Sequence, residues 1–132
     1  MMYFLDTNIV SYILKGNKRI LEKIENLIRN KNDVTLSSIT YYEVKRGLLA
    51  NGATKKLVLF LNFANKIGII DLRMSTFDIA STIYADLRKQ GQLIEDDDIF
   101  IGASALENDA ILITNNERHL GRIKDLKIEV WQ

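Results

Sequence analysis

Four consecutive acids, Glu95-Asp96-Asp97-Asp98, stand directly before an apolar run at residues 99–106. The run is too apolar for a surface helix, so it predicts a buried helix that carries Asp96 to Asp98 in its first turn. Capping of free N–H groups explains one acid at a helix start. Three adjacent acids, however, raise one another's pKa unless a cation or solvent separates them. The segment therefore has two interpretations, a site for a divalent metal ion or a solvated helix cap.

Other polar residues follow the short apolar runs that we expect to be strands. The carboxyl ends of parallel strands meet at one edge of a sheet, where ligands bind. Asp98 begins a helix that feeds the next strand, so it should open onto the same edge. The residues expected there are Asp6 after residues 3–5, Glu43 about one turn beyond residues 34–36, Asn116 after residues 110–113, and Asp98.

Carboxylates gathered in this way favour a hard divalent cation. Mg²⁺ and Mn²⁺ take oxygen ligands, and Mg²⁺ held by a few carboxylates keeps waters and completes its shell with phosphate oxygens. Such an ion can generate hydroxide and stabilise a developing negative charge. The chemistry that fits is hydrolysis of a phosphodiester without a protein nucleophile.

The elements that must position these residues alternate between strands and helices. This alternation predicts parallel pairing through right-handed crossovers, and therefore an α/β fold, a three-layer α/β/α sandwich. We expect a buried strand at 67–71, and a helix after it that is capped by Ser75 or Thr76 and buries Tyr84. Strands are expected at 3–5, 34–36, 67–71, 110–113 and 128–130, and helices at about 9–15, 18–30, 38–50, 54–66, 75–89, 96–106 and 117–120.

Composition limits the function classes. The 132 residues fit a single domain, 1–132, and the absence of cysteine excludes disulfides, thiolate catalysis and Cys-based zinc sites. The net charge of +1 means that nucleic-acid binding needs a local basic surface. No apolar run approaches membrane-spanning length, and no basic segment precedes one at the start, so we expect a cytoplasmic protein without a membrane partner.

Four motifs in this order and spacing resemble the PIN-domain ribonucleases of the VapC toxin type, over essentially the whole chain. The resemblance implies a Mg²⁺- or Mn²⁺-dependent endoribonuclease, the toxin of a type II toxin–antitoxin pair, usually dimeric and held inactive by a cognate antitoxin. The subgroup that looks closest cuts initiator tRNA. The motifs are Leu5-Asp6-Thr7-Asn8-Ile9, Ser38-Ile39-Thr40-Tyr41-Tyr42-Glu43-Val44-Lys45-Arg46-Gly47, Gly91-Gln92-Leu93-Ile94-Glu95-Asp96-Asp97-Asp98-Ile99-Phe100-Ile101-Gly102-Ala103 and Leu112-Ile113-Thr114-Asn115-Asn116.

The resemblance also assigns roles. Asp6 and Asp98 match the principal metal ligands of the family, and Glu43 matches a middle acid that binds metal directly or through water, so these three form the expected catalytic set. The fourth position stays open: many PIN domains have an acid where this chain has Asn116, and many close relatives have Glu where it has His119. Asp96 is the alternative fourth ligand, and a second metal ion should bind weakly or only with RNA.

Further residues are expected around the acids. Asp97 should face solvent, because successive helix positions point about 100° apart, and His119 is expected to be an ordinary surface histidine. Tyr41 or Tyr42 could stack on an unpaired base. The apolar faces of helices 18–30 and 54–66 could serve a dimer or an antitoxin. Thr7, Thr114 and Asn116 are expected to orient carboxylates or bind phosphate, and the candidate RNA contacts are Lys15, Lys45, Arg46, Arg118 and Arg122.

Two alternatives come from other classes. A signalling receiver domain would use Asp71 as phosphoacceptor with Thr114 and Lys124 or Lys127, but it needs an acidic pair after the first strand, where Asp6 stands alone. A haloacid-type phosphatase would need a second Asp at position 8, which is Asn8. A PIN scaffold that has lost activity and acts as a binding module is the other alternative.

Overall fold

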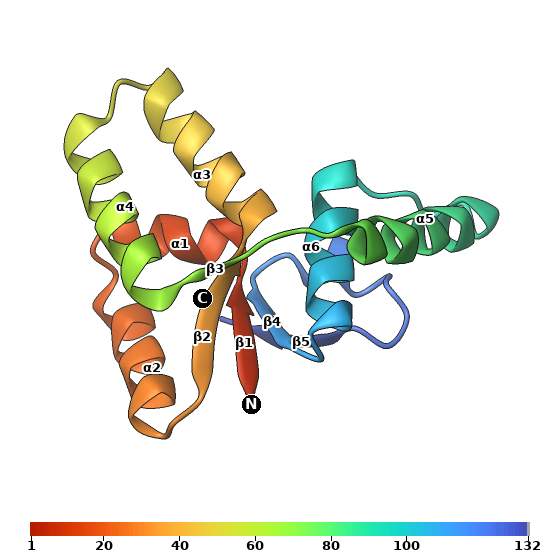
Figure 1. Cartoon of the computed structure of the whole chain (residues 1–132), viewed down its shortest axis with the longest axis horizontal. Helices are drawn as coiled ribbons and strands as arrows, with labels where there is room; N and C mark the ends of the chain where they lie inside the picture. Colours follow the sequence, from red (N-terminus) through yellow and green to blue (C-terminus); the bar gives the residue numbers. More distant parts are fainter. Residues whose placement is uncertain (132) are drawn as a thin grey trace.

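The computed structural model describes residues 1–131. The strands are β1 (Met2–Leu5), β2 (Asp33–Ser37), β3 (Ile69–Ile70), β4 (Ile111–Thr114) and β5 (Lys127–Val130). The helices are α1 (Thr7–Leu14), α2 (Lys18–Arg29), α3 (Ser38–Ala50), α4 (Thr54–Ile67), α5 (Met74–Lys89), α6 (Asp96–Glu107) and α7 (Glu117–Leu120). Figure 1 shows the strands at the centre with helices on both sides. Among residues 1–131, no helix is both long enough and apolar enough to cross a membrane.

The strands form one parallel sheet in the order β3-β2-β1-β4-β5. The chain leaves the central strand β1 toward β2 and later returns to its other side through β4. β1 and β4 therefore flank the point at which the strand order reverses, which is where open α/β sheets bind ligands. Asp6 follows β1 directly, and Thr114 is the last residue of β4.

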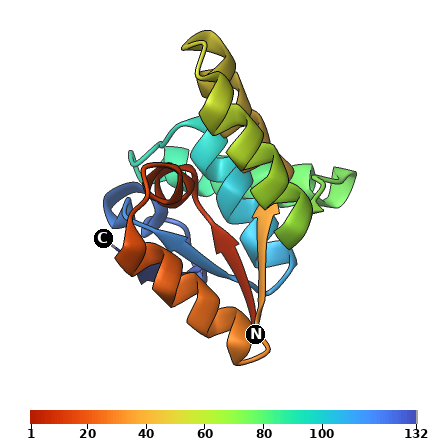
Figure 2. The same cartoon turned by 90° about the vertical axis from the view of Figure 1, so that its left-hand side faces the viewer.

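Alternation along the strands creates two apolar cores. Phe4 and Leu112 belong to a core that includes the buried faces of α5 and α6. Leu5 and Ile113 belong to a second core, formed with α1, α2, α3 and α4. The helices thus make two layers around the sheet, and Figure 2 shows the α3–α4 hairpin rising away from it. This confirms the predicted three-layer α/β sandwich with a parallel sheet.

Local sequence explains the helices that begin at the carboxyl edge. Asp6 caps α1 by accepting a hydrogen bond from Thr7 N at 2.8 Å, and Ser37 caps α3 through Ile39 N at 3.4 Å. α6 is buried along most of its length after the first turn, as its apolar sequence predicted. A Cβ on Gly102 would overlap with Ile123 Cδ1, so a side chain at this position of α6 would require the buried Ile123 to shift.

The structure corrects three expectations in the segment 67–84. The strand is only Ile69–Ile70 at the edge of the sheet, with Ile69 39% exposed, because α4 continues to Ile67 and Gly68 turns the chain at φ +91°. α5 is capped at Arg73, not at Ser75 or Thr76. Tyr84 is 43% exposed instead of buried.

The hydroxyls that were expected to cap α5 instead join it to α6. Both Ser75 and Thr76 donate hydrogen bonds to the carboxylate of Glu107 at the end of α6. Arg73 Nη2 lies 3.5 Å from Glu107 Oε1. These hydrogen bonds lower the pKa of Glu107, with Arg73 adding to the effect. The N-terminus of α5 is thereby attached to the C-terminus of α6.

Candidate active site

Asp6 is the centre of the site. Its side chain is almost fully buried at the carboxyl end of β1. Its Oδ2 accepts hydrogen bonds from Thr114 Oγ1 at 2.7 Å and Asn8 Nδ2 at 3.2 Å, and its Oδ1 accepts one from Thr7 N at 2.8 Å. Burial raises the pKa of Asp6, and these three hydrogen bonds oppose the shift. The carboxylate is therefore held in one orientation by neutral donors.

Two other acids share this environment. Thr7 Oγ1 donates to Glu43 Oε1 at 2.8 Å, which joins the turn after β1 to α3. Burial raises the pKa of Glu43 to about 7, and the neighbouring carboxyls of Asp97 and Asp6 add to the shift. Burial raises the pKa of Asp98, in the first turn of α6, to about 6, and the charge of Asp6 adds to it. We call Asp6, Glu43 and Asp98 the acidic cluster.

The acidic cluster fits the chemistry of a hard divalent cation. Its donors are all carboxylate oxygens, the kind that Mg²⁺ and Mn²⁺ prefer. Each carboxyl has a raised pKa, so a cation among them would relieve an unfavourable charge. Within residues 1–131, no three acids or histidines are already gathered closely enough to enclose an ion. An ion bound here would need waters and phosphate oxygens to complete its shell, as Mg²⁺ commonly does.

Asn116 and His119 lie beside the acidic cluster. Asn116 N donates to Thr114 Oγ1 at 2.9 Å, the same hydroxyl that holds Asp6. Asn116 Nδ2 lies 3.3 Å from His119 Nδ1, which in turn is 3.9 Å from Asp98 Oδ2. The structure therefore brings Asn116 to the site as expected. It also places there a histidine that was expected to be an ordinary surface residue, because α7 presents positions 116 and 119 side by side.

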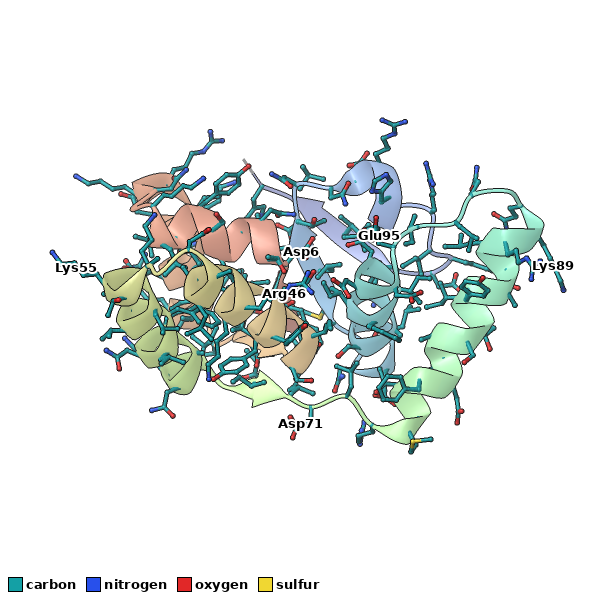
Figure 3. All side chains as sticks on the ribbon, turned by 90° about the horizontal axis from the view of Figure 1, so that it is seen from above. Asp6, Arg46, Lys55, Asp71, Lys89 and Glu95 are labelled. Atoms are coloured by element: carbon teal, nitrogen blue, oxygen red, sulfur yellow. The ribbon has the colours of Figure 1, made fainter. Side chains whose placement is uncertain are left out.

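Asp97 does not simply face solvent. Arg46 Nη2 lies 3.4 Å from Asp97 Oδ2 and 3.9 Å from Glu43 Oε2, so the guanidinium connects α3 to the first turn of α6. In the view of Figure 3, Arg46 lies on α3 toward α6, whose start is marked by Glu95. The expectation failed because α3 lies alongside this turn, so that position 97 faces α3 while position 98 faces Asp6.

Asp96 does not join the acidic cluster. It is exposed and lines a shallow groove between α5 and α6, together with Phe77, Tyr84 and Phe100. Two steps along a helix rotate the side chain by about 200°, so positions 96 and 98 point to nearly opposite sides. The structure thus offers no support for Asp96 as the fourth ligand.

The candidate RNA contacts separate by position. Lys15 caps the far end of α1 from Asp6, and Lys45 Nζ bonds to Tyr41 Oη at 3.3 Å. Arg122 Nη1 donates to the carbonyl oxygens of Gln92 and Leu93. Arg118 is exposed on α7, next to His119. Of these five candidates, Arg46 forms ion pairs with acids at the site, namely Glu43 and Asp97.

The two tyrosines beside Glu43 differ in the same way. Tyr41 packs against Phe60, with ring centroids 5.6 Å apart, and so belongs to the core. Tyr42 is 54% exposed, and Arg46 Cζ lies 5.0 Å from the centroid of its ring. Tyr42 is therefore the tyrosine that an unpaired base could reach.

The structure does not support the receiver alternative. Asp71 is exposed beyond the edge strand β3, and Figure 3 shows it far from Asp6. Thr114, the hydroxyl that a receiver would use, instead donates to Asp6. A phosphoacceptor at Asp71 would lack the acid pocket that the chemistry requires.

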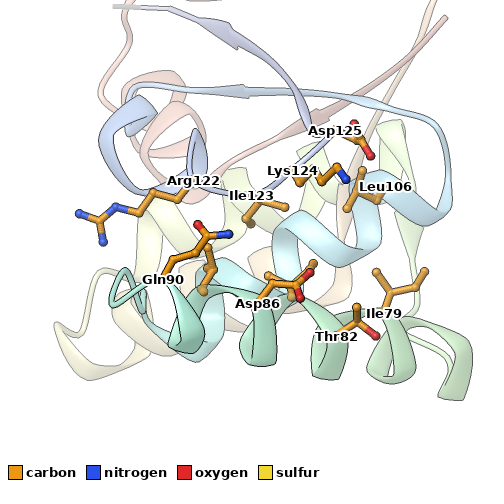
Figure 4. Close-up of a pocket in the computed structure, with 11 residues that line it drawn as sticks. Ile79, Thr82, Asp86, Gln90, Leu106, Arg122, Ile123, Lys124 and Asp125 are labelled. Atoms are coloured by element: carbon orange, nitrogen blue, oxygen red, sulfur yellow. The ribbon is translucent and has the colours of Figure 1, made fainter.

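A separate hollow of about 300 Å³ lies between α5 and the loop before β5 (Figure 4). Its floor is apolar, with Ile83 and Ile123, and charged residues such as Asp86 and Lys124 lie around it. None of its lining residues belongs to the acidic cluster. A shallower groove between α1 and α3, lined by Thr7 and Glu43 among others, does reach the cluster.

Comparison with known proteins identifies the family. The model of the PIN domain family matches residues 3–126. Ribonuclease VapC2 of Haemophilus influenzae is 34% identical over 130 residues, which are 98% of this chain and 97% of the relative. The tRNA(fMet)-specific endonuclease VapC of Shigella flexneri is 27% identical, with 98% and 97% covered. A similar fold is found in the crystal structure of VapBC2 from Rickettsia felis bound to a DNA fragment from the promoter. One of its chains superimposes on this chain with a TM-score of 0.89 and 29% sequence identity, and the match covers 100% of each of the two chains. This chain belongs to the PIN-domain family and, within it, to the VapC group.

Proposed function

We propose that this protein is a divalent-metal-dependent endoribonuclease, the toxin of a toxin–antitoxin pair, and that residues 1–132 act as one PIN domain. The observation that carries the proposal is the acidic cluster: three carboxyls from separate segments share one edge of the sheet, burial raises the pKa of each, and the charge of Asp6 adds to the shifts of Glu43 and Asp98. The ribonuclease names of the similar VapC proteins support it.

In this proposal the chain's own residues hold and orient the ligands. Asp6 and Asp98 bind the metal ion, and Glu43 binds it directly or through water. Thr114 and Thr7 fix Asp6 and Glu43 by the hydrogen bonds described above, and partners of this kind keep ligands in place. When bound, Mg²⁺ or Mn²⁺ supplies a Lewis acid for the scissile phosphate and lowers the pKa of water. Asn116 supports Thr114, and Arg46 is the candidate for contact with a phosphate.

The substrate and partners are part of the same proposal. We propose tRNA, with initiator tRNA first, because a similar VapC is named for tRNA(fMet); such a substrate implies action in the cytoplasm. A cognate antitoxin is supported by the similarity to a VapBC complex and by the groove beside Glu43, whose floor includes Val44 and Leu48. A homodimer is supported by exposed apolar residues of the α3–α4 hairpin, Leu49, Val58 and Leu59.

The test is cleavage of initiator tRNA and total RNA by purified wild type, Asp6→Asn and Asp98→Asn, with Mg²⁺ or Mn²⁺ and with EDTA. Loss of a residue that merely supports a ligand costs about 10–100-fold, so each variant should cleave at least about 100-fold more slowly. EDTA should stop the wild type. Circular dichroism of both variants controls for folding.

Two outcomes would contradict the proposal. Cleavage that survives in both folded variants, or in EDTA, would place the chemistry elsewhere. If the wild type binds RNA in the presence of Mg²⁺ or Mn²⁺ but cleaves none of it, the alternative is supported: a PIN scaffold that has lost activity and acts as a binding module.

A further inference from the structure

Arg46 is held at the edge of the acidic cluster by two helices. It follows Glu43 by one turn of α3, and its Nη2 approaches Asp97 Oδ2 at 3.4 Å and Glu43 Oε2 at 3.9 Å. Its Cζ lies 5.0 Å from the centroid of the Tyr42 ring, which supports the guanidinium from one side. The side chain is nonetheless 52% exposed. Arg46 is thus positioned without being buried.

The contacts leave much of the guanidinium free for an anion. Both acids are approached by the same nitrogen, Nη2, whereas an arginine offers five N–H donors in a planar fork that matches phosphate. An ion pair as exposed as that of Arg46 with Asp97 is weak, because solvent screens both charges. A phosphate oxygen can therefore replace the Asp97 carboxylate at little cost.

The charges around the acidic cluster make this exchange significant. Asp97 adds a fourth carboxyl to those of Asp6, Glu43 and Asp98, and its charge contributes to the raised pKa of the latter two acids. The whole chain carries a net charge of only +1, so it provides no general attraction for a polyanion. A phosphate that approaches the acids depends on a local cation, and Asp97 competes with it for that cation.

We propose that Asp97 competes with RNA for Arg46: it occupies the guanidinium in the free protein and yields it to an RNA phosphate bound beside the acidic cluster. This inference rests on the proposed function, because it names the substrate contact of the same site. The competition weakens binding of any RNA that places a phosphate at Arg46, because that phosphate must displace the Asp97 carboxylate. An RNA that does not reach Arg46 is unaffected by Asp97.

The test is a double-mutant cycle read by binding, without cleavage. A fluorescent single-stranded RNA oligonucleotide is titrated in EDTA with wild type, Asp97→Asn, Arg46→Gln and the double variant. Asp97→Asn should tighten binding about 2- to 5-fold, the range that an exposed ion pair of up to about 1 kcal/mol allows. Arg46→Gln should weaken binding and reduce the slope of log Kd against log salt by about 0.7, the value for one phosphate contact on a single strand. The double variant should bind like Arg46→Gln alone.

Asp96→Asn is the matched control. It removes the same charge one residue earlier in α6, but on the side that faces α5, and it should change Kd by less than about 1.5-fold because exposed charges far from the phosphate are screened. An equal gain from Asp97→Asn with and without Arg46 would overturn the inference, since Asp97 would then act by general repulsion. Weaker binding by Asp97→Asn would also overturn it.

Cleavage separates this inference from the proposed function. If the double-mutant cycle gives the expected affinities but no RNA is cleaved, the proposed nuclease function is wrong, whereas the competition between Asp97 and RNA for Arg46 is supported. If RNA is cut and the cycle is additive, only the competition fails. If Asp97→Asn abolishes cleavage as completely as Asp98→Asn, Asp97 is a metal ligand and the inference is wrong.

Discussion

At the scale of single residues, neutral hydroxyls hold the acids that burial makes hard to ionise. Thr114 and Thr7 donate to Asp6 and Glu43, while the guanidinium of Arg46 and the ring of His119 remain half exposed. Hydroxyl donors orient a carboxylate without neutralising it, so its charge stays available to a cation. A pair of buried arginines would have bound the same acids more tightly and made them poorer ligands.

The raised pKa values predict how stability changes with pH. An acid whose pKa is higher in the folded than in the unfolded protein stabilises the fold below its unfolded pKa, and this contribution is lost as the pH rises through the folded value. For Asp98 the window runs from 3.8 to about 6, and for Glu43 from 4.5 to about 7. At about 1.36 kcal/mol per pKa unit, these two groups correspond to a fall of about 5 kcal/mol in the free energy of unfolding between pH 4.5 and 7.5. Both are only half-buried, so solvent screening should reduce the fall measured in EDTA to about 3 kcal/mol. Urea unfolding at the two pH values measures it.

The double variant Glu43→Gln, Asp98→Asn is the control for this prediction. Its amides do not titrate, so its stability should depend less on pH over the same window. A decrease in the double variant as large as in the wild type would assign the pH dependence to other groups.

The sequence predicted the residues that follow strands better than those on helices. Asp6, Thr114 and Asn116 are positioned by strand ends, and the structure brings them together as the parallel sheet requires. Asp97 and His119 were misjudged because their directions depend on the rotation of α6 and α7 relative to neighbouring helices. That rotation follows from packing between distant segments, which local sequence does not specify.

At the scale of elements, α6 connects the acids to the rest of the fold. Its small residues let it lie against the sheet, α5 and the loop before β5, and Gly102 faces Ile123 of that loop. The apolar pattern was sufficient to predict such buried helices. The same pattern failed for β3, because the exposure of an edge strand depends on which elements lie beside it. It also failed for the start of α5, because Thr76 donates to Glu107 of α6 instead of capping its own helix.

Gly102→Ala should destabilise the protein. The new methyl group would overlap with the buried Ile123, and overpacking of this kind costs about 1–3 kcal/mol. Gly47→Ala is the matched control, since nothing lies within 4 Å of its Cβ position in α3, and alanine should add up to about 1 kcal/mol of helix propensity there. Urea unfolding compares the two; equal effects would mean that the loop moves aside freely.

At the scale of the whole molecule, the strand order creates the site. Because β1 is central and β4 returns on its other side, the two strands deliver Asp6 and Thr114 to one crevice. α3 and α6 then add Glu43 and Asp98 from either side. The parallel architecture was predictable from the alternation of strands and helices, but the strand order was not, because several orders satisfy the same alternation.

Metal binding should therefore stabilise the entire fold, independently of any cleavage. A ligand at 100 times its Kd adds about 2.7 kcal/mol to the free energy of unfolding. Thermal unfolding with saturating Mg²⁺ should show this increase at pH 8 and a smaller one at pH 5, where protons compete for Glu43 and Asp98. Asp6→Asn should remove most of it; an equal increase in that variant would mean that Mg²⁺ binds elsewhere.

The attachment of α5 has a consequence for how the molecule fluctuates. α5 lies on the far side of α6 from Asp6, buries Ile83 and Leu87 in the core that it shares with α6, and is fastened through Glu107. If α5 detached, the face of α6 that it covers would be exposed to water, and α6 carries Asp98 in its first turn. A ligand that displaced α5 would therefore disturb the position of Asp98 without occupying the acidic cluster.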